Sequence, residues 1–393
     1  MIRRPPFNLQ WHITGVCDLR CKHCYMFDGP RYQDEVRNEL SVEDCKRVID
    51  DFVETKKKWN AVGSIAFTGG HPLIRKGFWD IIGHARKRNL GDFVIMGNPS
   101  FLTREVALDL KRHGVVSYQI SIDGLEETHD NVRKKGSFQA TLNAYRILGE
   151  VGIERGIMMT LTPENKHDFL GVIRLAHEEK LDFFSFTRVS AEGNAEKNYK
   201  TVILDPWEYR ELYRQAVLLY MDLEAKGSRT YFDTKDHLWV PLFFEEGWIQ
   251  HESELSARHA RRCGMGLGAL TLLSDGTVLS CRRVNTAIGK VPEQKMADIW
   301  LHNKFLAEVR DNTSFKWCKE CKYNAWCLGC PAIAAALHGD LFGDDPQCWR
   351  IASKKAGQDP DVYWREKSEP YRSGEKAAPG VKPRLPEPSE CTG

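Results

Sequence analysis

The sequence lacks an excess of charge of either sign, a long apolar run and an apolar N-terminal segment. Its 393 residues carry 56 Lys and Arg against 54 Asp and Glu, which excludes the broad basic surface typical of a dedicated nucleic-acid-binding protein. No stretch approaches the apolar length that crosses a bilayer, and the first residues, MIRRPPFNLQWH, lack the apolar core of a signal peptide. These absences predict a cytoplasmic protein with neither a nucleic-acid partner nor a membrane partner.

The cysteines are numerous for such a compartment and unevenly spread. Hydrophobic residues make up 42% and charged residues 28%, an ordinary balance in a chain long enough for two domains, yet 12 residues are cysteine. In a reducing compartment, clustered thiols indicate metal binding or redox chemistry rather than disulfides. Three lie at Cys17, Cys21 and Cys24, and seven lie between Cys263 and Cys348.

Strand and helix signals alternate through the first half of the chain. Strands are predicted at 7–14, 64–70, 92–97, 116–124, 155–162 and 182–189, with helices between them. This order predicts parallel strands joined by helical crossovers, in a barrel or in an open twisted sheet. Sites in such folds lie at the carboxyl ends of the strands, so the first cysteine group and the segment TGGHP are expected to meet there.

The second half is organised differently. A long amphipathic helix is predicted at 205–226, followed by a stretch rich in Trp and Phe, and a hairpin is predicted at 269–281 around the turn Asp275-Gly276. The last residues are rich in Pro and charge without apolar periodicity. We expect four regions: 1–195, a bridging segment at 196–262, a cysteine-rich domain at 263–355, and a disordered tail at 356–393.

The first cysteine group is one thiol short of the usual four ligands. The next cysteine, Cys45, lies on the apolar face of a predicted helix, where a core residue is expected. A cubane iron-sulfur cluster held by three cysteines leaves one iron without a protein ligand. A chelating small molecule can bind that iron and receive an electron.

The spacing Cys-x3-Cys-x2-Cys at a strand-to-helix turn, with His23 just before the last cysteine, resembles the signature of radical S-adenosylmethionine (SAM) enzymes. The resemblance implies a partial (β/α)6 TIM-like barrel and a 4Fe-4S cluster held by Cys17, Cys21 and Cys24. In that family the open iron chelates SAM, and electron transfer cleaves SAM to a 5'-deoxyadenosyl radical. The protein supplies orientation and excludes water.

Further elements of the family are matched one by one. The second strand ends in Gly-Gly-His-Pro where the family has Gly-Gly-Glu-Pro, so His71 replaces the residue that contacts the amino group of SAM. The motif SIDG resembles the ribose-facing motif, and Arg133 resembles the arginine that meets the SAM carboxylate, although a simple turn and a solvated arginine are the alternatives. The implied cofactor-binding residues are His23, Gly69, Gly70, His71, Pro72, Ser121, Asp123 and Arg133.

The second cysteine group permits two interpretations on its own. Two structural zinc sites would need eight ligands, and His259 or His338 could supply the one that the seven cysteines lack. Beside the first motif, the arrangement resembles the SPASM extension, which holds two auxiliary 4Fe-4S clusters. The resemblance implies one cluster on Cys263, Cys281 and Cys330, and another on Cys318, Cys321, Cys327 and Cys348. The family usually has three residues, not two, before the position of Cys330.

One ligand of the first auxiliary cluster is not assigned. Some relatives carry an additional cysteine just upstream, but this chain has none between Cys45 and Cys263. The fourth iron is then open, or it is capped by His259, by another side chain or by a substrate thiolate. An open iron beside the radical site would suit bond formation to a peptide cysteine.

The resemblance implies a peptide or protein substrate, a radical SAM oxidoreductase that installs a thioether, carbon-carbon or related modification, and a reductant such as flavodoxin or ferredoxin. Alternatives are a sulfatase-maturase-like or haem-pathway oxidoreductase and, in another class, an iron-sulfur electron carrier or zinc protein. The first strand begins too early for an N-terminal leader-binding domain, so either a separate protein presents the peptide or residues 195–262 dock it. No catalytic acid or base is assigned.

Overall fold

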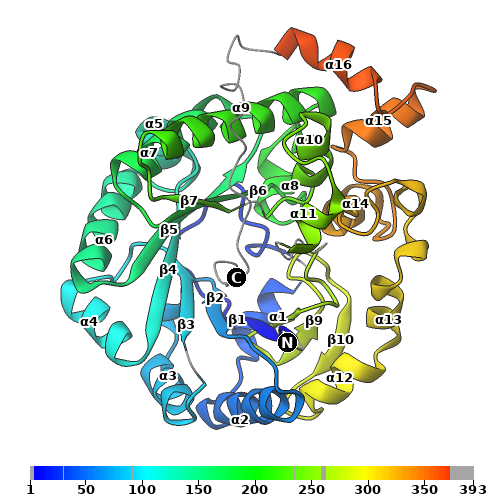
Figure 1. The fold of residues 1–393 in the computed structure, drawn as a ribbon. Helices are drawn as coiled ribbons and strands as arrows, with labels where there is room; N and C mark the ends of the chain where they lie inside the picture. Colours follow the sequence, from blue (N-terminus) through cyan, green and yellow to red (C-terminus); the bar gives the residue numbers. More distant parts are fainter. Residues whose placement is uncertain (1–3, 30, 91, 234, 258–262, 372–393) are drawn as a thin grey trace.

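The computed structural model describes residues 4–29, 31–90, 92–233, 235–257 and 263–371. Six parallel strands follow one another in the sheet in chain order, so each pairs with the next (Figure 1). The predicted partial barrel is therefore confirmed. The strands are β1 Asn8–Thr14, β2 Ile65–Gly69, β3 Phe93–Gly97, β4 Val115–Ser121, β5 Glu154–Leu161 and β6 Phe183–Arg188.

Helices between the strands cover the outer face of the sheet (Figure 1). Ser41 caps α2 by accepting a hydrogen bond from the backbone of Asp44, and α2 buries Cys45 at 1% exposure, so the predicted core role of this cysteine is confirmed. The helices of this half are α1 Tyr32–Arg37, α2 Val42–Trp59, η1 Pro72–Ile74, α3 Phe78–Lys87, α4 Arg104–Arg112, α5 Glu126–Val132, α6 Ser137–Val151, η2 Lys166–Asp168, α7 Phe169–Glu178 and α8 Asn194–Asn198.

The predicted hairpin forms but extends the same sheet. Strand β8 (Ala269–Leu272) runs antiparallel to β9 (Thr277–Leu279), and the Asp275-Gly276 turn joins them. β8 also pairs in parallel with β1, and β9 pairs with β10 (Ala287–Lys290), so the cysteine-rich region is attached to the barrel through backbone hydrogen bonds. The sheet contains ten strands and ends at β10 on one side and at β7 (Tyr231–Asp233) on the other.

The bridging segment packs into the core. It contains α9 Pro206–Ala225, β7, α10 Trp239–Glu245 and α11 Glu252–Ala257. Most of its large aromatic side chains are buried, including Tyr209, Tyr213, Phe232 and Phe243. Aromatic enrichment here therefore reflects packing between elements, and these side chains do not line an exposed groove.

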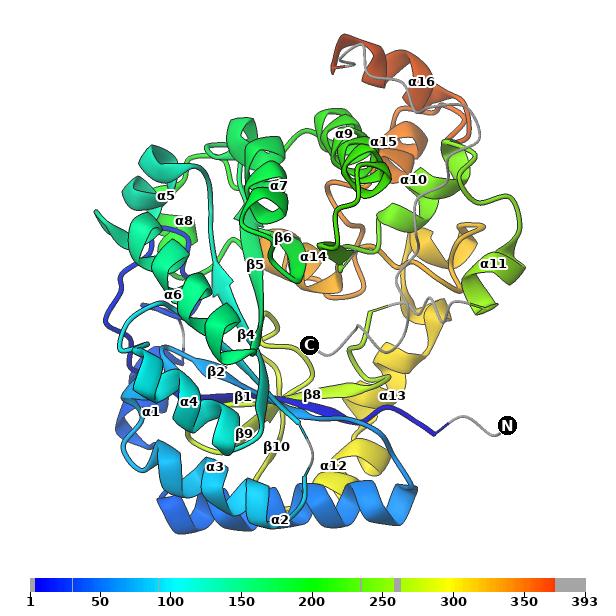
Figure 2. The same cartoon turned by 60° about the vertical axis from the view of Figure 1, so that its left-hand side comes forward.

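Short helices complete the cysteine-rich region and continue beyond it. They are α12 Met296–His302, α13 Lys304–Arg310, η3 Asn312–Ser314, η4 Trp317–Glu320, α14 Pro331–His338, α15 Trp349–Lys355, α16 Tyr363–Ser368 and η5 Glu369–Tyr371. Both α15 and α16 contact α9, and Figures 1 and 2 show the three helices side by side.

The predicted disordered tail begins too early. Residues 356–371 include α16, whose Trp364 is 4% exposed and lies under the Arg210 guanidinium at 3.5 Å from the ring centroid. Cation-π contact and burial offset the high local charge on which the disorder prediction rested. Residues 372–393 lie outside the described part of the chain. Within the described part, none of the helices combines the length and the apolar character that spanning a bilayer requires.

Candidate radical and auxiliary cluster sites

The first cysteine loop and the Gly-Gly-His-Pro loop meet where β1 and β2 end, as expected from the carboxyl-end rule. The backbone N–H of Gly70 donates to the carbonyl of Thr14 at 2.8 Å, and that of His71 donates to Val16 at 2.8 Å. A Cβ added at Gly70 would stand 2.0 Å from the Val16 carbonyl oxygen. Only glycine permits this approach, so the loop is fixed directly against the loop that carries the cysteines.

The three thiols of this loop form one electrostatic group. Cys21 is buried, and the neighbouring Cys17 and Cys24 are partly exposed. Burial raises the pKa of the Cys21 thiol to about 12, while the Arg133 guanidinium, whose Nη1 lies 3.6 Å from the sulfur, acts in the opposite direction. Thiols bind a cluster as thiolates and release their protons to water when iron binds, and an adjacent cation favours the thiolate form. The set fits a cluster held by three cysteines.

Asp123 connects this arginine to the cysteine loop. Its Oδ2 accepts hydrogen bonds from His23 Nε2, at 2.7 Å, and from Arg133 Nε. Its Oδ1 accepts the backbone N–H of Thr160 at 2.8 Å. The side chain is fully buried and the cations hold its pKa well below the usual range despite that burial. Protein groups bind both oxygens, so Asp123 orients His23 and Arg133.

His71 is also engaged by the protein itself. The ring is buried, its Nε2 lies 2.9 Å from the carbonyl oxygen of Ser100, and it stacks on Phe101 with centroids 5.9 Å apart. Burial lowers the pKa of this histidine, which keeps the ring neutral. The ring therefore braces the loop after β3. Of the other predicted contacts, the buried Pro72 begins η1, and Ser121 is half-buried at the end of β4.

Sequence reasoning missed the asparagines that hold this loop. Asn98 follows β3 directly, and its Nδ2 donates to Asp18 at 2.8 Å. Asn194 begins α8, after β6, and its backbone N–H donates to the carbonyl of Cys24 at 2.9 Å while its Nδ2 donates to that of Cys21 at 3.1 Å. Asn98 stands just beyond a strand end, so the carboxyl-end rule applied to every strand would have selected it, whereas no sequence signal marks Asn194.

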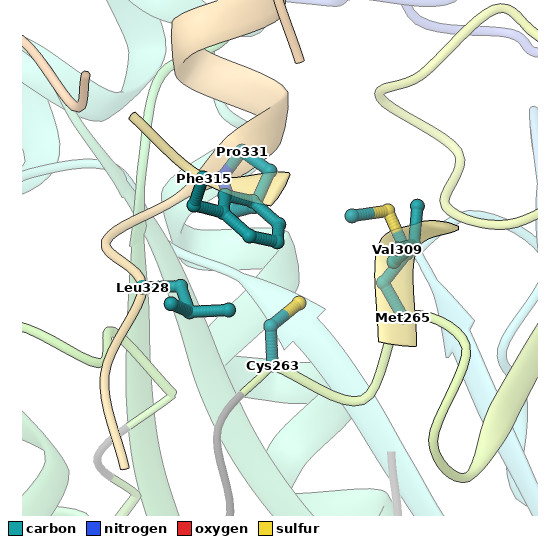
Figure 3. Close-up of a pocket in the computed structure, with 6 residues that line it drawn as sticks. All are labelled: Cys263, Met265, Val309, Phe315, Leu328 and Pro331. Carbon is teal, nitrogen blue, oxygen red and sulfur yellow. The ribbon is translucent and has the colours of Figure 1, made fainter. Parts of the chain in front are cut away.

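The first predicted auxiliary set is assembled from distant segments. The thiols of Cys281 and Cys330 are the main charged neighbours of the Cys263 thiol, whose pKa burial raises to about 12. In Figure 3 the Cys263 sulfur projects into a small apolar pocket. The pocket is lined by Cys263, Met265, Val309, Phe315, Leu328 and Pro331. An apolar shell around clustered thiols fits an iron-sulfur cluster shielded from water.

The second predicted auxiliary set also comes together. Cys318, Cys327 and Cys348 are buried, and burial raises the pKa of the Cys327 and Cys348 thiols. The thiols of Cys318 and the half-buried Cys321 raise both values further. Gly329, between Cys327 and Cys330, has φ of +62° and a Cβ there would stand 2.6 Å from the Cβ of Asp345. This left-handed turn lets the chain reach Cys330 with the short two-residue spacing.

The geometry bears on the zinc alternative. Within the described ranges, no three His, Cys, Asp or Glu side chains converge on a point that one metal ion could occupy. Ligands of a cubane cluster bind different iron atoms and stand farther apart than the ligands of a single zinc. His259, one predicted alternative ligand, lies outside the described residues.

Comparison with known families decides the class of the protein. The model described as the Radical SAM superfamily matches residues 11–176, and the SPASM model, an iron-sulfur cluster-binding domain, matches residues 263–322. The protein is a radical SAM enzyme with a SPASM domain. Its cofactors are accordingly SAM and iron-sulfur clusters, and the predicted family, enzyme class and cofactors are confirmed.

The radical SAM enzyme resembles curated proteins of two kinds. It is 29% identical over 363 residues to Fe-coproporphyrin III synthase of Methanosarcina barkeri, covering 86% of each chain. It is 26% identical over 361 residues to AdoMet-dependent heme synthase of Oleidesulfovibrio alaskensis, covering 89% of each chain. It is also 27% identical over 351 residues to the mycofactocin maturase MftC of Mycolicibacterium smegmatis, covering 87% of this chain and 82% of MftC.

Solved structures share the fold at low identity. Streptococcus suis SuiB bound to precursor peptide SuiA superposes with a TM-score of 0.67 and 18% identity, over 87% of this chain and 76% of that one. Native anSMEcpe with bound AdoMet and Cp18Cys peptide gives a TM-score of 0.68 and 17% identity, over 93% and 96% of the two chains. Both likenesses show a shared fold over most of each chain.

Proposed function

We propose that this radical SAM enzyme abstracts hydrogen from a ribosomally made peptide and installs a thioether, carbon-carbon or related modification. The likeness to the mycofactocin maturase MftC supports a peptide substrate. We assign Cys17, Cys21 and Cys24 to the SAM-binding cluster. SAM bound to that cluster supplies the radical, and the residues around the site hold SAM and the substrate in register.

The observation that carries the proposal is that Tyr25 and Arg282 link the two three-cysteine sets. Tyr25 follows Cys24 directly; burial raises its pKa to about 12, and the thiols of Cys24 and of Cys281 in the first auxiliary set raise it as well. Arg282 lies 5.6 Å from the Tyr25 ring centroid and pairs with Glu35 at 2.7 Å. A substrate beside Tyr25 and Arg282 would have the radical cluster site on one side and an auxiliary cluster site on the other.

We propose that the first auxiliary cluster keeps one iron for the substrate. Cys263, Cys281 and Cys330 are its proposed ligands, and no fourth described cysteine joins their group. A peptide cysteine thiolate at that iron would be held beside the carbon that loses hydrogen. A well-ordered protein ligand on the same iron in a substrate-bound crystal structure would contradict this step.

The setting and partners follow from the same proposal. None of the described cysteines is in a disulfide, which favours a reducing compartment such as the cytoplasm and a reductant such as flavodoxin or ferredoxin. Because the aromatic residues of the bridging segment are buried, we favour a separate protein for leader-peptide presentation. A small precursor peptide is the expected substrate.

A haem-pathway reaction is the second candidate, because the likeness to Fe-coproporphyrin III synthase is 29% over 363 residues. Arg282 suits it, since its buried Nε has no hydrogen-bond partner in the described part of the chain and could pair with a tetrapyrrole carboxylate.

The experiment is anaerobic. The reconstituted enzyme is given SAM, a strong reductant, and either a candidate precursor peptide or an iron porphyrin. About twelve irons per chain are expected from three cubane clusters. Peptide product lighter by one pair of hydrogens, formed together with 5'-deoxyadenosine, supports the maturase. Porphyrin turnover with no peptide product favours the second candidate, and bound zinc with no deoxyadenosine contradicts both.

A further inference from the structure

Arg283 lies directly against the first auxiliary set. Its Nη2 donates to the sulfur of Cys330 at 3.5 Å, and its charge counteracts the burial that raises the pKa of the Cys281 thiol. Its Nη1 donates to the backbone carbonyl of Arg188 at 3.3 Å. The guanidinium is thus fixed between the end of β6 and one of the three proposed ligands.

Two nearby carboxylates, Asp236 and Asp345, are paired with Arg188. Burial raises the pKa of a third, Glu192, and the charges of Arg282 and Arg283 counteract it without a direct ion pair. Arg188, 2% exposed, makes a two-pronged pair with Asp345 at 2.8 Å for each oxygen and also pairs with Asp236. Asp345 also accepts the backbone N–H of Cys330 at 2.7 Å. In the part of the chain that the structure describes, no carboxylate forms an ion pair with Arg283. Its positive charge therefore acts on the sulfurs without a directly bonded counter-charge.

The second auxiliary set has different surroundings. The sulfur of Cys327 accepts the uncharged backbone N–H of Gly329 at 3.4 Å. Arg350, a cation near Cys321, is itself paired with Glu245 at 3.1 Å and with Asp361. One auxiliary set thus receives a hydrogen bond from a cation that has no ion-pair partner among the described residues, whereas the arginine near the other set is paired with acids.

We infer that Arg283 raises the reduction potential of the cluster at Cys263, Cys281 and Cys330, and so makes it the more easily reduced of the two auxiliary clusters. Hydrogen bonds to cluster sulfurs and nearby positive charge both stabilise the reduced, more negative cluster. Arg283 is thus a tuning residue that acts through the cluster. The inference rests on the proposed ligands of the two clusters and needs no assumption about the substrate.

The test is an anaerobic redox titration of the reconstituted enzyme, without substrate, followed by electron paramagnetic resonance. In Arg283→Gln, one auxiliary signal is expected at lower potential, with its reduced-to-oxidised ratio at a fixed potential falling about tenfold, which is 59 mV for a one-electron couple. Arg283→Lys keeps the charge and should restore much of the ratio. Cys318→Ala should remove the signal of the second auxiliary cluster. The auxiliary signal that remains should then be the one whose potential Arg283→Gln lowers.

The matched control is the double variant Arg282→Gln with Glu35→Gln. It removes a buried ion pair next to the same site without changing the net charge, and its potentials should stay at those of the parent. Unchanged potentials in Arg283→Gln at full iron content would overturn the inference. So would loss of the cluster iron in both Arg283 variants, because the arginine would then be structural. Neither result depends on which substrate the enzyme modifies.

Discussion

The two three-cysteine sets each place one arginine on one sulfur, but they treat its charge differently. Arg133 lies 3.6 Å from Cys21 and is paired with the buried Asp123, whereas Arg283 lies 3.5 Å from Cys330 and is anchored by a backbone carbonyl. A cation locked to a carboxylate mainly orients its surroundings. A cation without that partner changes the energy of charge on the sulfur. Similar contacts therefore serve positioning at one site and tuning at the other.

Removing a sulfur from the radical set gives the largest expected effect. Cys21→Ala should abolish reductive cleavage of SAM, because the proposed cluster loses a ligand that is buried behind the other two. The assay is 5'-deoxyadenosine formation with a strong reductant, and Cys45→Ala, a core cysteine outside all three sets, serves as the control. SAM cleavage at the parent rate in Cys21→Ala would contradict the assignment of the SAM-binding cluster to this set rather than to the first auxiliary set.

Removing a sulfur from the four-cysteine set should affect the SPASM domain without affecting the binding of SAM to the barrel. We expect Cys318→Ala to bind SAM as the parent does, while iron content falls by about one cluster of four irons and product formation is lost. SAM binding is measured by equilibrium dialysis and iron by a colorimetric assay. An unchanged iron count would show that Cys318 is not a ligand, and the contrast between tuned and untuned auxiliary sites would fail with it.

A substitution of Asp123 tests whether its carboxylate neutralises the buried charge of Arg133. Asp123→Ala leaves a buried arginine unpaired and should lower the free energy of unfolding by about 3 to 5 kcal/mol. Chemical denaturation of the apoprotein measures it. The control Asp109→Ala removes an exposed pair with Arg112 at 2.7 Å and should cost no more than about 1 kcal/mol. Equal losses in the two variants would mean that Asp123 does not neutralise a buried charge.

Residues that lie close together in one loop could be assigned from the sequence, whereas pairs that meet only after folding could not. Cys17, Cys21 and Cys24 lie in one loop after a clear strand, so spacing alone defines their set. The six strands were also predictable because apolar runs and turn residues alternate regularly. Arg188 and Asp345 could not be paired from sequence, since they are far apart in the chain and meet only after the SPASM region packs on the barrel. Asp123 was recognised as a motif residue, but its role depends on which groups fill its oxygens.

The smallest expected effect is the pH dependence of stability that a buried histidine near the radical set should contribute. His129 is fully buried behind Asp123, whose backbone N–H donates to His129 Nδ1 at 3.2 Å. Burial, then the charge of Arg133, lower the pKa of this histidine from 6.5 to about 4. Between these values the unfolded chain binds more protons than the folded one, so the free energy of unfolding should fall as pH drops from 6.5 towards 4 and change no further through this group below that.

The shift corresponds to a loss of about 3 kcal/mol across that window, at 1.36 kcal/mol per pKa unit. Denaturation of the apoprotein at a series of pH values measures the slope, and His129→Gln should make it shallower, while the exposed His302→Gln should leave it as in the parent. Part of the slope should remain in His129→Gln, because burial also lowers the pKa of His12, His71 and His237. A slope equal to that of the parent in His129→Gln would show that His129 does not contribute to it, and the positioning network around Asp123 would lose its expected pH-sensitive group.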